Sequence, residues 1–161
     1  MQNETNRVLY QVAEPWNFES EGSPLPLVKD LAKVMIEQGG IGLAAPQIGW
    51  SKRVFVMGNP DKLIACINPT FYSVDGGGLE LGLEGCLSFP HLWLRVKRHL
   101  NINAQYYDVE GNIVEVPYTG IMSRVYQHEY EHLEGICFTS KVSKFALEQA
   151  TRRQKKAQRK G

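Results

Sequence analysis

One short segment, His128–His132 with the sequence His-Glu-Tyr-Glu-His, constrains the fold of this chain more than any other. Residues four apart share a face of an α-helix, so both imidazoles can reach one ion while Glu129 approaches a bound water. The flanking pattern predicts a helix from about Ile121 to Leu133, and Gly135 is placed to end it. The fold must therefore surround a helix whose two rings face an interior site.

The remaining periodic segments indicate further helices and short strands. Apolar side chains at Leu27 and at the fourth, seventh and eighth positions after it predict a helix over Leu25–Gln38, which stops at Gly39-Gly40. A third helix is expected from Ser143 to about Ala157. Runs rich in β-branched and aromatic residues predict strands, with a hairpin turn at residues 108–112: Arg53–Met57, Leu63–Asn68, Phe71–Val74, one long strand over Leu94–Tyr107, and Ile113–Val116.

This order, a helix followed by strands and then two helices, favours the α+β class over a doubly wound sheet. We expect small mixed β-sheets packed around the central helix that carries the His-Glu-x-x-His motif. A chain of 161 residues with 43% hydrophobic and 22% charged residues is the size and composition of one globular domain.

The cysteines and the hydropathy pattern indicate where the chain works. Three scattered cysteines, Cys66, Cys86 and Cys137, do not form a disulfide framework, and their odd number suits a reducing compartment. No apolar run reaches the roughly 18 residues that cross a bilayer, and the polar start at Met1–Arg7 is no signal peptide. We therefore expect a soluble, cytoplasmic protein with no membrane partner.

Charge is distributed unevenly along the chain. Residues 141–161 carry eight Lys and Arg against one Glu, whereas residues 1–140 carry 10 basic and 16 acidic side chains. An acidic body with a basic tail suggests that the tail binds a polyanion, RNA above all. The alternative is a tail that is only solvated.

A metal site on the central helix needs a further ligand, because a catalytic zinc-type centre has three protein ligands and one open position. One metalloprotease class places a third histidine six residues after the second, where this chain has Phe138. A glutamate from a later helix would have to be Glu148, which lies among cations. His91, His99 and Cys86 remain, and Cys86 is the better candidate because Gly85 and the Ser88…Pro90 bend can expose its sulfur beside a backbone N–H. Cys66 and Cys137 are expected to be small buried hydrophobic residues, and His91 and His99 to be surface or strand residues.

The segment 39–47, Gly-Gly-Ile-Gly-Leu-Ala-Ala-Pro-Gln, is a third feature. Glycines at 40 and 42 allow close approach of another backbone, and Gln47 offers an amide donor at the end of a restricted turn. The segment is no phosphate loop, because no Gly-Lys-Ser/Thr follows. Alone it indicates a tight structural turn.

Taken together and in order, three segments resemble the signature motifs of the peptide deformylase family: Gly40–Gln47, Glu84–Ser88 and Gln127–His132. The resemblance spans about residues 25–140. It implies a hydrolase that removes the N-formyl group from the initiator methionine of newly made polypeptides and releases formate. Residues 1–142 would be the catalytic domain, and residues 143–161 a basic C-terminal helix or tail.

The resemblance also implies roles for individual residues. It implies Cys86, His128 and His132 as ligands of one divalent metal ion, usually Fe²⁺ in this family, with Zn²⁺, Ni²⁺ or Co²⁺ also accepted. It further implies Glu129 as general acid and base, and an oxyanion hole made by Gln47 and the backbone N–H of Leu87.

Substrate binding follows from the same resemblance. The substrate backbone would pair as an added strand beside Ile41-Gly42 and lie next to Gly85. The methionine side chain would enter a pocket lined by Ile41, Ile121, Val125 and the ring of His128. In bacterial members a C-terminal helix contacts the ribosome, which suits the basic tail of this chain. Formylated nascent polypeptides are thus the expected partners, with the ribosome as a further one and no DNA.

Departures from the family pattern bear on these expectations. Glu131 replaces the usual aspartate before the second histidine, which alters a contact to a ligand or to a nearby arginine. Trp93 stands where many bacterial members have a basic residue, which affects recognition beyond the methionine. Glu84 and Arg98 are expected to form an ion pair. Two other readings are a small zinc protease and a catalytically silent member that serves as a structural or ribosome-binding module.

Overall fold

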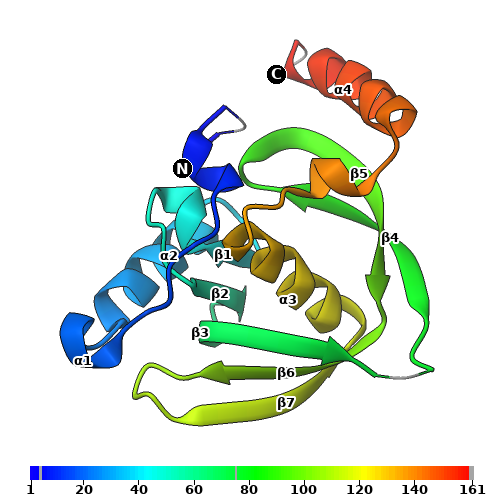
Figure 1. Ribbon diagram of the computed structural model, residues 1–161. Coiled ribbons are helices and arrows are strands. Elements are labelled where there is room, and N and C mark those ends of the chain that lie inside the picture. The colour runs from blue at the N-terminus through cyan, green and yellow to red at the C-terminus, as the bar shows by residue number, and fades with distance from the viewer. Residues whose placement is uncertain (4, 75, 160–161) are drawn as a thin grey trace.

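The computed structural model describes residues 1–3, 5–74 and 76–159. Figure 1 shows a long hairpin and a sheet on either side of one central helix. The helical elements are η1 (Arg7–Tyr10), α1 (Phe18–Glu21), α2 (Leu25–Glu37), η2 (Ala45–Ile48), α3 (Gly120–Leu133), η3 (Phe138–Lys141) and α4 (Lys144–Gln158). The strands are β1 (Gly42–Ala44), β2 (Val54–Asn59), β3 (Lys62–Ser73), β4 (Leu79–Cys86), β5 (Phe89–His99), β6 (Asn101–Tyr107) and β7 (Ile113–Thr119).

The described strands form two separate sheets. One has five strands in the order β1-β2-β3-β6-β7, and the other is the β4-β5 hairpin. Every pairing within them is antiparallel, not mixed as expected, because most neighbouring strands are joined by short turns. The α+β class and the central helix are confirmed.

Helix α3 packs against the five-stranded sheet through aromatic side chains. Tyr126 is fully buried, and its ring lies edge-on to Phe55 with centroids 5.1 Å apart and to Phe71 at 6.0 Å. Its hydroxyl donates to the carbonyl of Thr70 at 2.8 Å, where β3 is interrupted by a bulge. This contact ties the helix that carries both histidines to the sheet.

The other two long helices cover different parts of the molecule. The face of α2 predicted from sequence, with Leu27, Leu31 and Met35, packs in one cluster with Leu43 and Val56 of β1 and β2.

Helix α4 begins at Ser143, whose hydroxyl accepts the Ala146 N–H at 3.2 Å. It lies on the hairpin, where Ala150 is buried and Gln154 donates to the Pro90 carbonyl at 2.8 Å. Among the described residues, no helix is long and apolar enough to span a membrane.

The strand predictions were partly wrong. The single strand expected over Leu94–Tyr107 breaks at Leu100, because the Leu100 N–H bonds Gly78 and its carbonyl accepts from Gly120. The two halves therefore lie in different sheets. The runs Leu63–Asn68 and Phe71–Val74 are one strand, β3, which ends at Ser73 and carries a bulge in which Asn68 has φ +48°. Strands β1 and β4 were not predicted.

We expect Tyr126→Phe to lower the free energy of unfolding by about 1–3 kcal/mol, because it removes the buried hydroxyl that donates to the carbonyls of Thr70 on β3 and Gln105 on β6. Urea denaturation followed by circular dichroism measures this change. Tyr72→Phe on an exposed position of β3 is the matched control and should change stability by less than about 0.5 kcal/mol. Equal stability of the two variants would show that the hydroxyl contributes nothing.

Candidate metal centre

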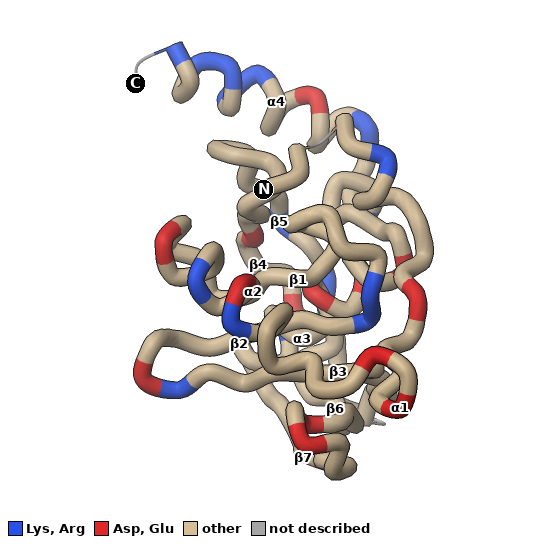
Figure 2. Tube along the Cα trace, turned by 90° about the vertical axis from the view of Figure 1, so that its left-hand side faces the viewer, with Lys and Arg blue, Asp and Glu red and all other residues tan. Residues whose placement is uncertain are grey.

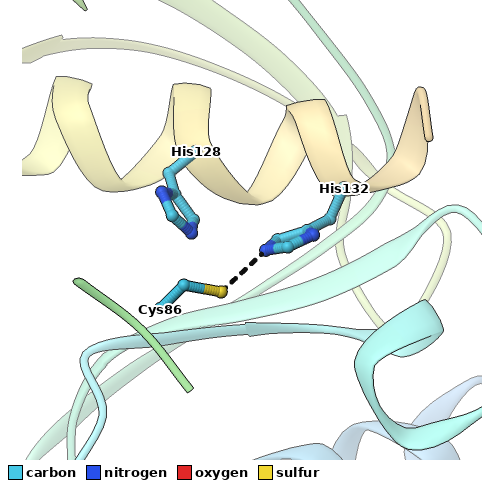
Figure 3. A group of neighbouring side chains, drawn as sticks. All are labelled: Cys86, His128 and His132. Carbon is cyan, nitrogen blue, oxygen red and sulfur yellow. Dashed lines mark hydrogen bonds between the residues drawn. The ribbon is translucent and has the colours of Figure 1, made fainter. Parts of the chain in front are cut away.

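Three side chains from two elements meet beside α3. Cys86 ends β4 at the tight turn of the hairpin, and His128 and His132 lie one turn apart on α3. One ligand atom from each lies within 4.8 Å of the other two, and Cys86 Sγ is 3.3 Å from His132 Nε2 (Figure 3). The expected set of three is therefore brought together, in an arrangement that could hold a metal ion.

The donor set fits a divalent transition-metal ion. His132 is buried, and burial lowers its pKa well below the usual value, so its ring is neutral and has a lone pair to offer. Its Nδ1 has no hydrogen-bond partner among the described residues. A soft sulfur with two imidazoles suits Fe²⁺ or Zn²⁺ and disfavours Mg²⁺, which prefers oxygen.

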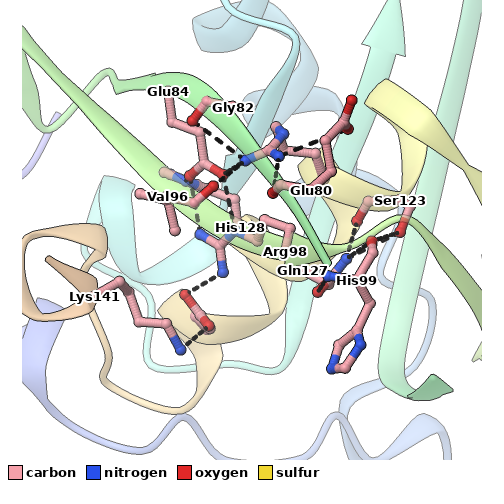
Figure 4. Close-up of polar contacts among 12 residues, drawn as sticks. Glu80, Gly82, Glu84, Val96, Arg98, His99, Ser123, Gln127, His128 and Lys141 are labelled. Atoms are coloured by element: carbon pink, nitrogen blue, oxygen red, sulfur yellow. Dashed lines mark hydrogen bonds and ion pairs between the residues drawn. The ribbon is translucent and has the colours of Figure 1, made fainter. Parts of the chain in front are cut away.

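The buried carboxylate of Glu84 accepts four hydrogen bonds. Its Oε1 accepts from Arg98 Nε and Arg124 Nη1, each at 2.8 Å. Its Oε2 accepts from Arg98 Nη2 and His128 Nδ1, each at 2.9 Å (Figure 4). A carboxylate has about four lone-pair positions, so this one is saturated. The expected Glu84–Arg98 ion pair is confirmed.

This saturation determines the state of the His128 ring. Burial alone would raise the pKa of Glu84, but the hydrogen bonds from Arg98 and His128 lower it to about 2. An ionised carboxylate only accepts, so Nδ1 of His128 must carry a proton. In the neutral ring the lone pair is then on Nε2, the nitrogen that remains for a metal ion.

The charged network continues outward from Arg98. Its Nη1 pairs with Glu131 Oε2 at 2.7 Å, and Glu131 Oε1 pairs with Lys141 Nζ at 2.8 Å. Glu131, the departure noted in the sequence, thus contacts the arginine that holds Glu84. The ion pair between Glu131 and Lys141 also attaches the end of η3 to α3.

Arg124, which the sequence analysis missed, joins α3 to both strands of the hairpin. Besides Glu84 it donates to the carbonyl of Val96 on β5 and to that of Glu80 on β4, each at 2.8 Å. A Cβ at Gly82 would lie 2.6 Å from the guanidinium carbon, so the close approach requires glycine there. The sequence signal that could have identified Arg124 was its position one helical turn before His128, on the same face of α3.

Glu129 lies against the glycine segment. A Cβ at Gly42 would stand 2.5 Å from Glu129 Oε1, which explains the glycine at 42. Glu129 Oε2 is buried with no hydrogen-bond partner among the described residues. Burial raises the pKa of this carboxyl to about 7, so its protonation changes near neutral pH.

Gln47 presents its amide nitrogen to the same site. Its Oε1 accepts the Ala44 N–H at 2.9 Å, which fixes the orientation of the amide. Its Nε2 then lies 3.5 Å from Cys86 Sγ and 3.2 Å from Ser88 Oγ. The donor expected from the sequence thus points toward the sulfur of Cys86.

A cleft of about 540 Å³ opens onto this group of residues. Every residue expected to act in catalysis, in metal binding or on the substrate lines it except the deeply buried His132: Ile41, Gly42, Gln47, Gly85, Cys86, Leu87, Ile121, Val125, His128 and Glu129. Val125 is buried, whereas Ile41 and Ile121 are more than half exposed at the rim. Leu83, His91 and Trp93 also line the cleft. The sequence analysis linked Trp93 to recognition beyond the methionine but did not assign Leu83 or His91 to the cleft.

The residues considered for other ligand sets lie elsewhere or serve packing. Phe138 is buried, and its ring centroid is 5.6 Å from that of His128. Glu148 is exposed on α4. His91 and His99 lie in β5, as expected for strand residues. Cys66 and Cys137 are buried, as predicted.

Comparison with known proteins places this geometry in context. The family model for polypeptide deformylase matches residues 2–148. A peptide deformylase of Treponema pallidum (strain Nichols) is 40% identical over 147 residues, which cover 90% of this chain and 88% of that protein. One of Acidobacterium capsulatum is 38% identical over 159 residues, covering 96% and 92%. The crystal structure of peptide deformylase from Thermus thermophilus superposes with a TM-score of 0.84 at 36% identity over 98% of each chain.

Arg124→Met keeps much of the side-chain volume but removes the donors that Arg124 itself gives to Glu84 and to the carbonyls of Glu80 and Val96. We expect the affinity for a divalent metal to fall about 10-fold or more, because Glu84, which accepts a hydrogen bond from His128, loses the hydrogen bond from Arg124. Competition against a chromophoric chelator measures this affinity. Arg124→Lys should be intermediate, and Arg153→Met on the exposed face of α4 should bind as the original chain does. Unchanged affinity in Arg124→Met would contradict this role.

Proposed function

The chain belongs to the polypeptide deformylase family, and from this premise we propose that Cys86, His128 and His132 bind the metal ion with which it removes the N-formyl group from nascent polypeptides. One observation carries the proposal. The three ligand atoms lie within 4.8 Å of one another, and Cys86 and His128 line a cleft together with Glu129, whose Oε2 is buried with no hydrogen-bond partner among the described residues.

We propose Fe²⁺ as the native ion. The thiolate and two imidazoles support this choice, and the same donors accept Zn²⁺, Ni²⁺ or Co²⁺. When bound, the ion supplies Lewis-acid chemistry, which acidifies water and polarises a carbonyl oxygen. A thiolate ligand also donates more charge than a carboxylate would.

Glu129 acts as the proton carrier in this proposal. Its carboxylate accepts the proton of the attacking water and afterwards delivers it to the leaving amine, so the formyl carbon leaves as formate. The buried position beside Gly42 supports this role, because it raises the pKa of the carboxyl to about 7.

Gln47 and the backbone N–H of Leu87 stabilise the charge that develops on the formyl oxygen. The fixed amide orientation of Gln47 supports the assignment, since its nitrogen needs no rearrangement during the reaction. A donor of this kind contributes about 3–4 kcal/mol in acyl-transfer sites.

The cleft determines which substrate binds. The substrate backbone pairs beside Ile41 and Gly42 and passes Gly85 as an added strand. The methionine side chain lies against Ile121, Val125 and the His128 ring, an apolar surface that suits an unbranched thioether. All of these residues line the cleft, which supports the proposal.

Residues 1–142 form the catalytic domain in this proposal, and residues 143–161 a basic element that binds the ribosome in the cytoplasm. Arg152, Arg153, Lys155 and Lys156 support it, because they are exposed along α4, where Figure 2 shows one red segment among the blue ones. Exposed cations of this kind favour a polyanion such as ribosomal RNA.

Formate release from formyl-Met-Ala-Ser under anaerobic conditions tests the function. We expect Glu129→Ala to lower kcat by about 10²–10⁴-fold while the protein still binds one metal ion per chain, because only proton transfer is lost. Chelation should abolish activity and lower Tm, since the metal binds the folded state alone.

The same assay separates the other two readings. Cleavage of an internal peptide bond would indicate a protease, which the buried Phe138 in place of a third histidine disfavours. A metal-loaded chain that releases no formate would be a silent member of the family. Either result contradicts the proposal.

Neutralising Arg152, Arg153, Lys155 and Lys156 to Gln tests the basic element without removing the packed face of α4. Co-sedimentation with ribosomes should weaken and lose part of its salt dependence, because fewer phosphates are contacted. Hydrolysis of formyl-Met-Ala-Ser should stay the same. Co-sedimentation equal to that of the original chain would dismiss the ribosome contact.

A further inference from the structure

The β4-β5 hairpin has two faces of opposite character. Residues 92, 94, 96 and 98 of β5 are buried, whereas 91, 93, 95 and 97 are exposed, so alternate side chains point inward and outward. The inward side chains of β5 pack in the core or hold Glu84. The outward side chains make a second surface, most of which lies outside the cleft of the catalytic proposal.

This outer face combines a row of leucines with a row of cations. Leu79, Leu81 and Leu83 on β4 are 62%, 50% and 56% exposed. In the strand register, Leu81 lies opposite Lys97 and Leu83 opposite Arg95. The residues that alternate outward on the two strands include no acidic side chain: Leu79, Leu81, Leu83, His91, Trp93, Arg95, Lys97 and His99. Glu80, whose side chain is 55% exposed near the start of β4, lies on the other side of the hairpin, with its carboxylate 3.8 Å from the Arg124 guanidinium.

The outer face is continuous with the cleft. Leu83 and Trp93 belong to both, and Trp93 is 58% exposed while its ring packs over Gly85. From Leu83 the row leads away from the site to Leu79, a distance of roughly 13 Å along a strand. An extended peptide that leaves the cleft on this side covers that distance with about four residues.

Charge and packing indicate which partner fits this surface. A second copy docked by the same face would place its cations against these cations, which disfavours self-association. An extended chain with apolar and acidic side chains meets both rows. The inner contacts of Arg124 with both strands hold the hairpin in place, so binding costs little ordering of the surface.

We propose that the outer face of the hairpin, from Leu83 to Leu79, binds the segment of the nascent chain that follows the first residues after the formylmethionine, with preference for apolar and acidic side chains. This inference rests on the proposed function. It makes the hairpin an extended recognition surface in addition to the carrier of Cys86. Substrate length and sequence beyond the cleft then affect the reaction.

The test compares a three-residue substrate, formyl-Met-Ala-Ser, with two eight-residue substrates that begin with the same residues. One continues with alternating Leu and Asp, and the other with alternating Gly and Lys. We expect the Leu/Asp peptide to have a KM about 10-fold below that of the short peptide, because two or three leucines are partly buried on binding. The Gly/Lys peptide should show no gain, and kcat should be similar for all three.

The double variant Leu79→Ser/Leu81→Ser should lose the gain in KM for the Leu/Asp peptide and keep the kinetics of the short one. Lys97→Glu should reduce the preference for the acidic peptide. Tyr72→Ser/Ile113→Ser removes two equally exposed apolar side chains from the five-stranded sheet and serves as the matched control.

Equal KM for short and long substrates, or a gain that survives in Leu79→Ser/Leu81→Ser, overturns the inference. Sedimentation that shows a dimer dispersed by the same variant would assign the face to a second copy and overturn it as well. Failure to release formate from the short peptide would instead contradict the proposed function, so the two failures are distinguishable.

Discussion

The carboxylate of Glu84 is the contact on which the arrangement of the site depends. It comes from the hairpin that carries Cys86, and it bonds His128 and Arg124 of α3 as well as Arg98 of its own hairpin. Two arginines compensate its charge, and the charges of Arg98 and Lys141 are in turn shared with Glu131. Removing one member of such a buried network leaves a charge without its partner, which costs about 3–5 kcal/mol. Cys86 and His128, which come from distant segments of the chain, are thus held near each other by Glu84 and two arginines, which are not part of the expected ligand set.

Other elements of the fold support the contact between α3 and the β4-β5 hairpin from different sides. Tyr126 attaches α3 to the five-stranded sheet, and α4 covers the hairpin through Ala150 and Gln154. The glycine at 42 lets β1 approach Glu129, while the glycine at 82 makes room for Arg124. The cleft lies between these parts and is lined by buried side chains such as Val125 and Glu129 and by the more exposed Ile41 and Ile121.

The sequence predicted what depends on local pattern. The helical period located α2, α3 and α4, and three motifs in order indicated residues that the structure brings together: Cys86, His128 and His132, with Glu129 and Gln47 beside them. The prediction failed where distant contacts decide. The alternation of apolar and polar side chains continues from β5 through Leu100 into β6. No local signal in the sequence therefore showed that the two strands belong to different sheets. In β4 the leucines face outward, which hid the strand because a core face was expected to be apolar. The place of Arg124 depends on Gly82, more than 40 residues away along the chain, and only the folded hairpin brings the two together.

The most direct test of the account is the near-ultraviolet absorption of the Co²⁺-loaded protein, titrated to its metal equivalence point. A sulfur ligand gives a thiolate-to-metal charge-transfer band, and among the described residues Cys86 is the cysteine whose sulfur is grouped with the histidine pair. We predict one ion per chain and a band that is absent in Cys86→Ser but unchanged in Cys137→Ser. A band that persists without the Cys86 sulfur, or a chain that binds Co²⁺ without any such band, would contradict a centre made of one thiolate and two imidazoles.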